Sequence, residues 1–112
     1  MIYFLLHMNK TNINKEIDYI KEQIVRKYKP QKIILFGSAA AGKFTADSDL
    51  DLFIIKEDAR PGSERIYSVS GMFEHRIATD ILVYTPQEVE QSMKWDDPFV
   101  KGILSSGKII YG

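Results

Sequence analysis

The sequence predicts an α/β (α+β) fold, in which helices flank a small mixed β-sheet. Two observations predict it. Short runs of β-branched and aromatic residues alternate along the chain with stretches whose apolar residues recur every three or four positions, which is typical of strands and helices packed in layers. Prolines and glycines stand between these stretches, where turns are expected. No stretch has the composition of a linker, so residues 1–112 are expected to form a single domain.

The first half of the chain predicts one long helix and two strands. A helix over residues 11–28 carries an apolar stripe, with Asn12 or Asn14 as its N-cap and Lys29-Pro30 ending it. A strand over 32–36, one short helical turn over 38–42 and a strand over 48–56 follow.

The second half continues the alternation. A loop over 58–62 precedes a helix over 63–74, whose apolar residues include Tyr67 as an expected core residue. A strand over 76–85, a helix over 86–94 that begins with a proline, and a helix from 97–98 to 104 come next. Residues 105–107 read as a turn and 108–111 as a last strand.

Residues 1–10 are expected to be an extension or an extra strand. Their apolar run is much shorter than the ~20 residues that cross a bilayer, and it lacks a basic leader and a cleavage site. We therefore expect no membrane partner. Met8 is an alternative start to Met1.

The charge and cysteine content narrow the function classes. Fifteen basic and fifteen acidic side chains cancel, so no whole-protein field favours nucleic acid, and no direct nucleic-acid binding is expected. The absence of cysteine excludes disulfides, thiolate zinc sites and cysteine nucleophiles, and it fits a cytoplasmic location.

Asp49 and Asp51 are the main candidates for chemistry. They lie two residues apart on an expected strand, so their side chains share one face. Two carboxylates at ~4 Å repel by about 4 kcal/mol at an effective dielectric near 20, which favours a cation between them. Oxygen ligands without histidine or thiol favour Mg²⁺ or Mn²⁺. The alternative is an aspartate turn that caps the strand.

Two further features complete the candidate site. Gly37-Ser38 follows a strand and opens a helical turn, where close backbone approach and a hydroxyl can bind phosphate; an ordinary strand-to-helix turn is the alternative. Asp80 stands among apolar neighbours in the third strand, where a charge is costly unless it is paired or bound to metal. If the second and third strands are adjacent, Asp80 faces Asp49 and Asp51 and can ligate metal or deprotonate an attacking hydroxyl. The alternative is a solvated aspartate at the strand edge.

The combined pattern resembles the minimal nucleotidyltransferase (MNT) family of the DNA polymerase beta superfamily. The resemblance rests on three segments: Gly37-Ser38-Ala39-Ala40-Ala41-Gly42, Ser48-Asp49-Leu50-Asp51-Leu52, and Asp80. It implies the nucleotidyltransferase (DNA polymerase beta-like) fold and Mg²⁺-dependent transfer of a nucleoside monophosphate from a triphosphate, with ATP as the nucleotide substrate. Asp49, Asp51 and Asp80 would be the catalytic and metal residues, and Gly37, Ser38, Gly42, Lys43 and Ser48 would bind the nucleotide.

Small members of this group resemble the antitoxins of HEPN/MNT toxin–antitoxin pairs, which implies adenylylation of a tyrosine on a helical HEPN-type partner. Larger relatives carry an acceptor-binding helical domain, so we expect a partner protein, or a homo-oligomer interface, to supply the acceptor. The alternatives are an antitoxin or adaptor that acts by binding alone, and a small-molecule nucleotidyltransferase of the aminoglycoside-modifying kind.

One departure from the family pattern concerns residues 39–41. Members often carry an arginine in this loop, and here three alanines occupy it. Lys43 can replace that charge only as a point charge, because it lacks the planar fork of arginine; a solvated surface lysine is the alternative. Three aromatic residues late in the chain, Trp95, Phe99 and Tyr111, are interpreted as core or as a protein contact rather than as a base-stacking surface.

Overall fold

The computed structural model describes residues 10–45 and 47–112. The expected extension or strand at 1–10 lies outside the described residues apart from Lys10, and so do both candidate start methionines.

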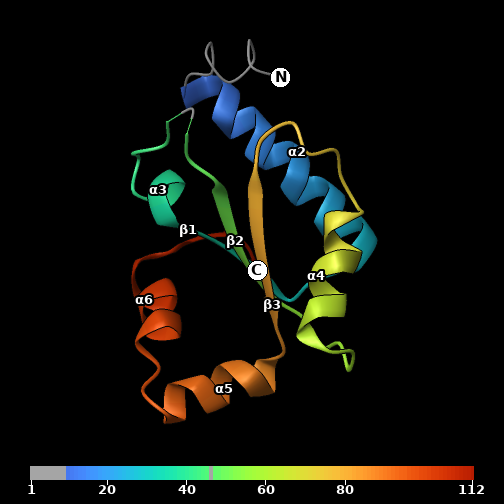
Figure 1. Ribbon diagram of the computed structural model, residues 1–112, viewed down its shortest axis with the longest axis vertical. Helices are drawn as coiled ribbons and strands as arrows, with labels where there is room; N and C mark the ends of the chain where they lie inside the picture. Colours follow the sequence, from blue (N-terminus) through green and yellow to red (C-terminus); the bar gives the residue numbers. More distant parts are fainter. Residues whose placement is uncertain (1–9, 46) are drawn as a thin grey trace.

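The centre of the molecule is a four-stranded mixed sheet with the order β3-β2-β1-β4 (Figure 1). Its strands are β1 (Lys32–Phe36), β2 (Leu50–Ile55), β3 (Thr79–Tyr84) and β4 (Lys108–Tyr111). β1 pairs antiparallel with β2 and with β4, whereas β2 and β3 run parallel. This arrangement confirms the predicted fold class of a mixed sheet flanked by helices.

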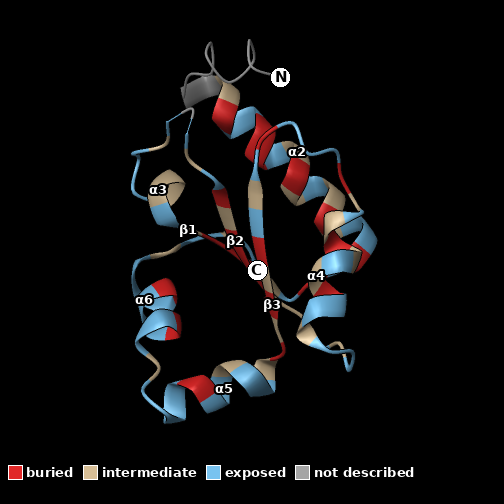
Figure 2. Ribbon diagram, in the orientation of Figure 1, coloured by how far each residue is buried: buried red, intermediate tan, exposed pale blue. Residues whose placement is uncertain are grey.

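One face of the sheet is covered by α2 (Lys10–Tyr28) and α4 (Gly62–Ser70), which lie on the same side in Figure 1. The apolar stripe of α2 packs there against alternate strand residues such as Leu50, Leu52 and Ile81. The buried residues of α2 follow one line along the helix in Figure 2. Burial of this stripe is the main reason why the helix is stable, because helix propensity alone contributes little.

The opposite face is covered by α5 (Pro86–Lys94) and α6 (Pro98–Ser106). A second buried cluster forms there from Ile34, Phe53, Val100 and Ile103. Leu82 packs against this cluster, which explains why it interrupts the alternation expected of the third strand. Both faces of β3 are partly covered, so the strand needs apolar residues on both sides.

The ends of α2 differ in part from expectation. The helix begins at Lys10, so Asn12 and Asn14 lie inside it and the expected N-cap is wrong. The predicted end is confirmed: Lys29 adopts a left-handed conformation with φ 53°, and its N–H donates to Val25 O at 3.1 Å. The following proline cannot continue the helix.

Helix α4 is shorter than predicted, because it ends at Ser70 instead of residue 74. Gly71 follows it, and glycine favours a helix end. His75 Nε2 then lies 2.7 Å from Ser70 O. The expectation that Tyr67 is a core residue is wrong: it is 84% exposed, because the buried side of this helix runs through Arg65 and Val69, each two positions away.

The expected strands over 48–56 and 76–85 are also too long, and the last helix is too short. The Leu50 N–H donates to Ala78 O at 2.9 Å, directly before the ladder of β2 and β3 begins. Helix α6 runs to Ser106. The Ser106 hydroxyl donates a hydrogen bond to Gly102 O at 2.7 Å. The expected turn over 105–107 is therefore wrong in its first two residues. The short turn α3 (Gly37–Ala40) opens at the end of β1.

Candidate functional site

The three candidate carboxylates lie on adjacent strands of the sheet. Asp51 of β2 and Asp80 of β3 are direct partners in the parallel register. Asp49 directly precedes β2 and stands two residues before Asp51, so strand alternation places it on the Asp51 face of the sheet. That face also carries Phe53 and α6. The condition set by the sequence, that the second and third strands be neighbours, is met.

Asp51 is half-buried, and its carboxylate is repelled by the carboxylates of Asp80 and Asp49. Burial raises the pKa of its carboxyl above the usual 3.8, and the nearby charges of Asp80 and Asp49 raise it further. The central strand therefore holds a carboxylate whose charged form is disfavoured at this place. A bound cation would remove this repulsion, and an all-oxygen donor set of carboxylates suits Mg²⁺ or Mn²⁺.

In the described part of the chain, no three acidic, histidine or cysteine side chains stand close enough together to hold a metal ion as they are. Asp49 and Asp80 are both exposed, so their carboxylates have room to turn toward Asp51. Mg²⁺ commonly takes one or two protein carboxylates and completes its shell with water and substrate phosphate oxygens. The donor set therefore fits a metal that arrives with a nucleotide.

The glycine turn and the carboxylates meet at Gly37. Phe36, the last residue of β1, is the strand partner of Asp51, so the chain turns directly beside that carboxylate. Gly37 has φ +72°, and a Cβ placed on it would overlap the Asp51 carboxylate. Only glycine satisfies both the left-handed backbone and the close approach. The two halves of the predicted motif are thus in contact.

The rest of the turn, residues 38–43, is half-buried or exposed. Ser38 is half-buried and its carbonyl accepts from the Lys43 N–H at 2.8 Å, which closes the turn. Gly42 has φ +73°, and the Gly42 and Lys43 side of the loop faces solvent. The Ser48 hydroxyl accepts from the Thr45 N–H at 3.0 Å, so it braces the loop that leads to Asp49. The nucleotide-binding roles predicted for these residues stay predictions.

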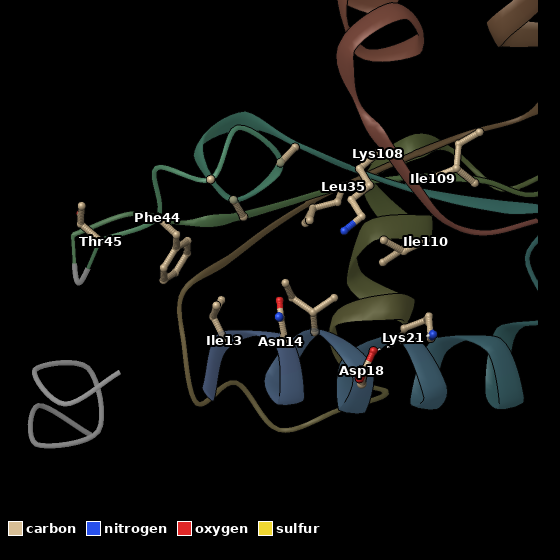
Figure 3. A pocket seen from close by; sticks show the side chains of 14 residues that line it. Ile13, Asn14, Asp18, Lys21, Leu35, Phe44, Thr45, Lys108, Ile109 and Ile110 are labelled. Carbon is tan, nitrogen blue, oxygen red and sulfur yellow. Dashed lines mark ion pairs between the residues drawn. The ribbon is translucent and has the colours of Figure 1, made fainter. Parts of the chain in front are cut away.

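A groove of about 740 Å³ opens elsewhere on the molecule, between α2, the α3 turn and β4. Figure 3 shows its lining, including Ile13, Phe44 and Ile110. Leu35 also lines it and packs in the core under α2. Phe36, the next residue, points to the opposite face, where it adjoins Asp51. The groove and the carboxylates therefore lie on opposite faces of the sheet.

Sequence reasoning did not find one neighbour of the carboxylates, the aromatic pair Phe36 and Phe99. The two rings meet edge to face, with centroids 6.1 Å apart. The position of Phe36 directly before Gly37 was the available signal, because alternation along the strand places it on the same face as its partner Asp51.

The other weighed residues have structural contacts. The His75 ring stacks on Phe73 with centroids 4.5 Å apart. Arg60 pairs with Asp58 at 2.7 Å, and Lys56 lies over the Tyr28 ring. The contacts of Lys56 and Asp58 lie just after the end of β2, whereas Asp51 stands near its start.

Comparison with known proteins identifies a family and structures of similar fold. The family described as "Polymerase beta, Nucleotidyltransferase" matches residues 17–112. The crystal structure of a presumed nucleotidyltransferase from Sulfolobus solfataricus is similar in fold, with a TM-score of 0.51 and 22% identity, over 77% of this chain and 84% of that chain. Among curated proteins, none matches. Within residues 10–45 and 47–112, no helix combines the length and apolarity needed to cross a membrane.

Proposed function

This chain belongs to the polymerase beta nucleotidyltransferase family, and we propose that it transfers AMP from ATP to a hydroxyl of a partner protein. The observation that carries the proposal is the placement of Asp51, which adjoins Asp80 on one side and the Gly37 turn on the other. The carboxylates and the glycine turn thus lie at the same end of the sheet, where β1 ends and β2 begins.

Asp49, Asp51 and Asp80 are the residues that would hold Mg²⁺. Bound there with the nucleotide, the metal neutralises charge on the triphosphate and on the departing pyrophosphate. The Gly37 backbone lies beside Asp51, and this backbone and the Ser38 hydroxyl would contact the phosphates. Lys43 is exposed and would contribute long-range attraction only.

Asp80 is placed to act on the acceptor. It is exposed at the edge of the sheet, because β3 is an edge strand. An acceptor hydroxyl that approaches from this side would give its proton to the Asp80 carboxylate while its oxygen attacks the α-phosphorus. The bond from that phosphorus to the bridging oxygen breaks, and pyrophosphate leaves with the electron pair.

The identity of the acceptor is supported by the motif resemblance to MNT antitoxins, in which a tyrosine of a helical HEPN-type toxin receives AMP. We propose the same class of partner for this chain. The exposed position of Asp80 is consistent with an acceptor as large as a protein, since a side chain on a protein surface can reach an open sheet edge.

Pyrophosphate release from ATP tests this proposal, with a helical HEPN-type protein as partner. We expect release only with Mg²⁺ and partner, and a loss of at least about 100-fold in Asp49→Asn/Asp51→Asn. Asp47→Asn is the matched control, because Asp47 is an exposed aspartate in the same loop and should leave the rate unchanged. Equal rates in wild type and the double variant would refute catalysis.

A second candidate function is neutralisation of the partner by binding alone. The alanine turn favours it, since none of the residues of α3 supplies a charge. Suppression of the partner's toxicity in cells separates the two functions. Full suppression by the double aspartate variant would establish binding as the function, and loss of suppression would support transfer.

A further inference from the structure

Phe99 differs from the other exposed apolar side chains because it adjoins the carboxylate site. It is 51% exposed and its ring meets Phe36 edge to face. Phe36 is in turn the strand partner of Asp51 and directly precedes Gly37. An exposed aromatic surface is thus linked by one intervening ring to the carboxylate and the glycine turn.

The backbone that carries Phe99 is firmly held. Asp97 caps α6 and accepts from the Phe99 N–H at 2.9 Å. Val100 and Ile103, which are 0% and 4% exposed, fix the helix on the sheet. Phe99 therefore presents its ring from a rigid position, and such a ring loses little conformational freedom when a ligand packs on it.

The separation suits a nucleotide. Facing side chains on paired strands have Cβ atoms ~5 Å apart, and the Phe36 and Phe99 ring centroids are 6.1 Å apart. Adding these steps along Phe36 puts the Phe99 ring no farther than roughly 15 Å from the Asp51 carboxylate. The sugar of a nucleotide would bridge such a gap, with its phosphates at the carboxylates and its base at the ring.

We propose that Phe99, supported from behind by Phe36, is the surface on which the base of the bound nucleotide stacks. This inference rests on the proposed nucleotidyl transfer and extends it to the base. Stacking requires a flat ring and reads no hydrogen-bond pattern, so it tolerates different bases and favours larger ones. Purine triphosphates are the expected substrate class, with ATP and GTP binding within a few-fold of each other.

Calorimetry with two ligands tests the role of Phe99. With Mg²⁺ present, Phe99→Ala should weaken ATP binding roughly 5- to 100-fold and leave inorganic tripolyphosphate binding unchanged, since tripolyphosphate has no base. Tyr67→Ala, which removes an 84% exposed ring from α4 on the other face, should change neither affinity. Thermal melting checks that Phe99→Ala is folded.

The outcomes separate the two proposals. If wild type binds both ligands and Phe99→Ala still binds ATP normally, the stacking surface is refuted while nucleotidyl transfer stands. Equal weakening of both ligands, or weakened partner binding with normal ATP binding, also refutes stacking. If wild type binds neither ligand, both proposals fail.

Fluorescence gives a second readout. Trp95 is the single tryptophan of the chain, so Trp95→Phe/Phe99→Trp places the only indole at position 99. Stacking predicts that ATP and GTP quench its emission and that tripolyphosphate does not. Equal responses to ATP and tripolyphosphate would overturn the assignment.

Discussion

The carboxylates and the glycine turn lie close together at one end of the sheet, but the protein holds them in place in different ways. Asp51 belongs to the central strand β2, and its flanking residues Leu50 and Leu52 are 0% and 1% exposed. The turn from Gly37 to Lys43 is partly or fully exposed at every residue. The core therefore fixes the carboxylate position, whereas the turn is held by glycine geometry, a few backbone hydrogen bonds and the packing of Ala39 and Ala40 on the core.

This difference indicates which half of the site tolerates change. A residue between two buried neighbours on a paired strand cannot move without disturbing the core. Ala39 and Ala40 pack on the core from the turn, so the turn keeps this packing without a charged residue. The site thus depends on its strand half for precision, and Gly37 is the point where the two halves meet.

The largest effect is expected from the carboxylate half. Asp80→Asn removes the proposed proton acceptor and keeps the shape of the side chain, so kcat for AMP transfer should fall by about 10²–10⁴. The Asp80 side chain is exposed, so the melting temperature should change little. Steady-state kinetics with the partner protein measure this, and a raised KM with normal kcat would contradict the role.

Substitution of two glycines tests the contact between the carboxylates and the glycine turn. Gly37→Ala should cost ~1–3 kcal/mol of stability and about 100-fold in rate, because its Cβ would displace the Asp51 carboxylate. Gly42→Ala has nearly the same φ, yet among the described residues no atom lies within 4 Å of the added Cβ. It should show only the backbone cost of ~1–2 kcal/mol. Denaturant titration and transfer assays report both, and equal rate losses would show that contact with Asp51 is unimportant.

The charge of Asp51 should oppose folding when no metal is bound. The pKa of the Asp51 carboxyl is raised in the folded state. Its contribution to the stability of the fold is therefore fully present below the pKa of the unfolded chain. That contribution is lost as the pH rises through the pKa of the folded state. In metal-free buffer at pH 7, Asp51→Asn should therefore melt slightly above wild type, by a few degrees, and the gap should narrow toward pH 4.

Added Mg²⁺ should reverse this order, because metal that binds only the folded wild type stabilises it by mass action. Melting curves across pH, with chelator or with Mg²⁺, provide the test. A variant that melts below wild type in chelator at every pH would contradict the proposed repulsion.

The smallest effect is expected from Lys43→Ala. The side chain is exposed, and an exposed point charge contributes little through solvent. Transfer rates should change less than about threefold, with a weaker dependence on salt. A loss of tenfold or more would show that Lys43 replaces the arginine found in relatives.

Much of the fold followed from the sequence because its signals are local. The apolar stripe of α2, the proline that opens α5 and the β-branched strand β1 each predicted their element within one residue. Helix α4 and strand β3 were less predictable, because apolar Met72, Phe73 and Ile77 between them are needed by the core and imitate a continued helix or strand.

The sequence proposed the residues of the candidate site but not their neighbours. Asp49 and Asp51 were proposed from their spacing on an expected strand, and Asp80 from its charge among apolar strand residues; their roles stay predictions. The contact of Gly37 with Asp51, and the approach of Phe99 to Phe36, depend on which strands pair and where α6 packs. Such long-range pairings are not encoded in any short segment of the chain.

Calorimetry of ATP binding, with and without Mg²⁺, tests the central claim most directly, because it needs neither partner nor turnover. The account predicts that wild type binds ATP only when Mg²⁺ is present, and that Asp49→Asn/Asp51→Asn binds weakly under both conditions. Asp47→Asn should behave as wild type. Equal ATP affinity in wild type and the double variant in the presence of Mg²⁺ would contradict a nucleotide site built on these carboxylates.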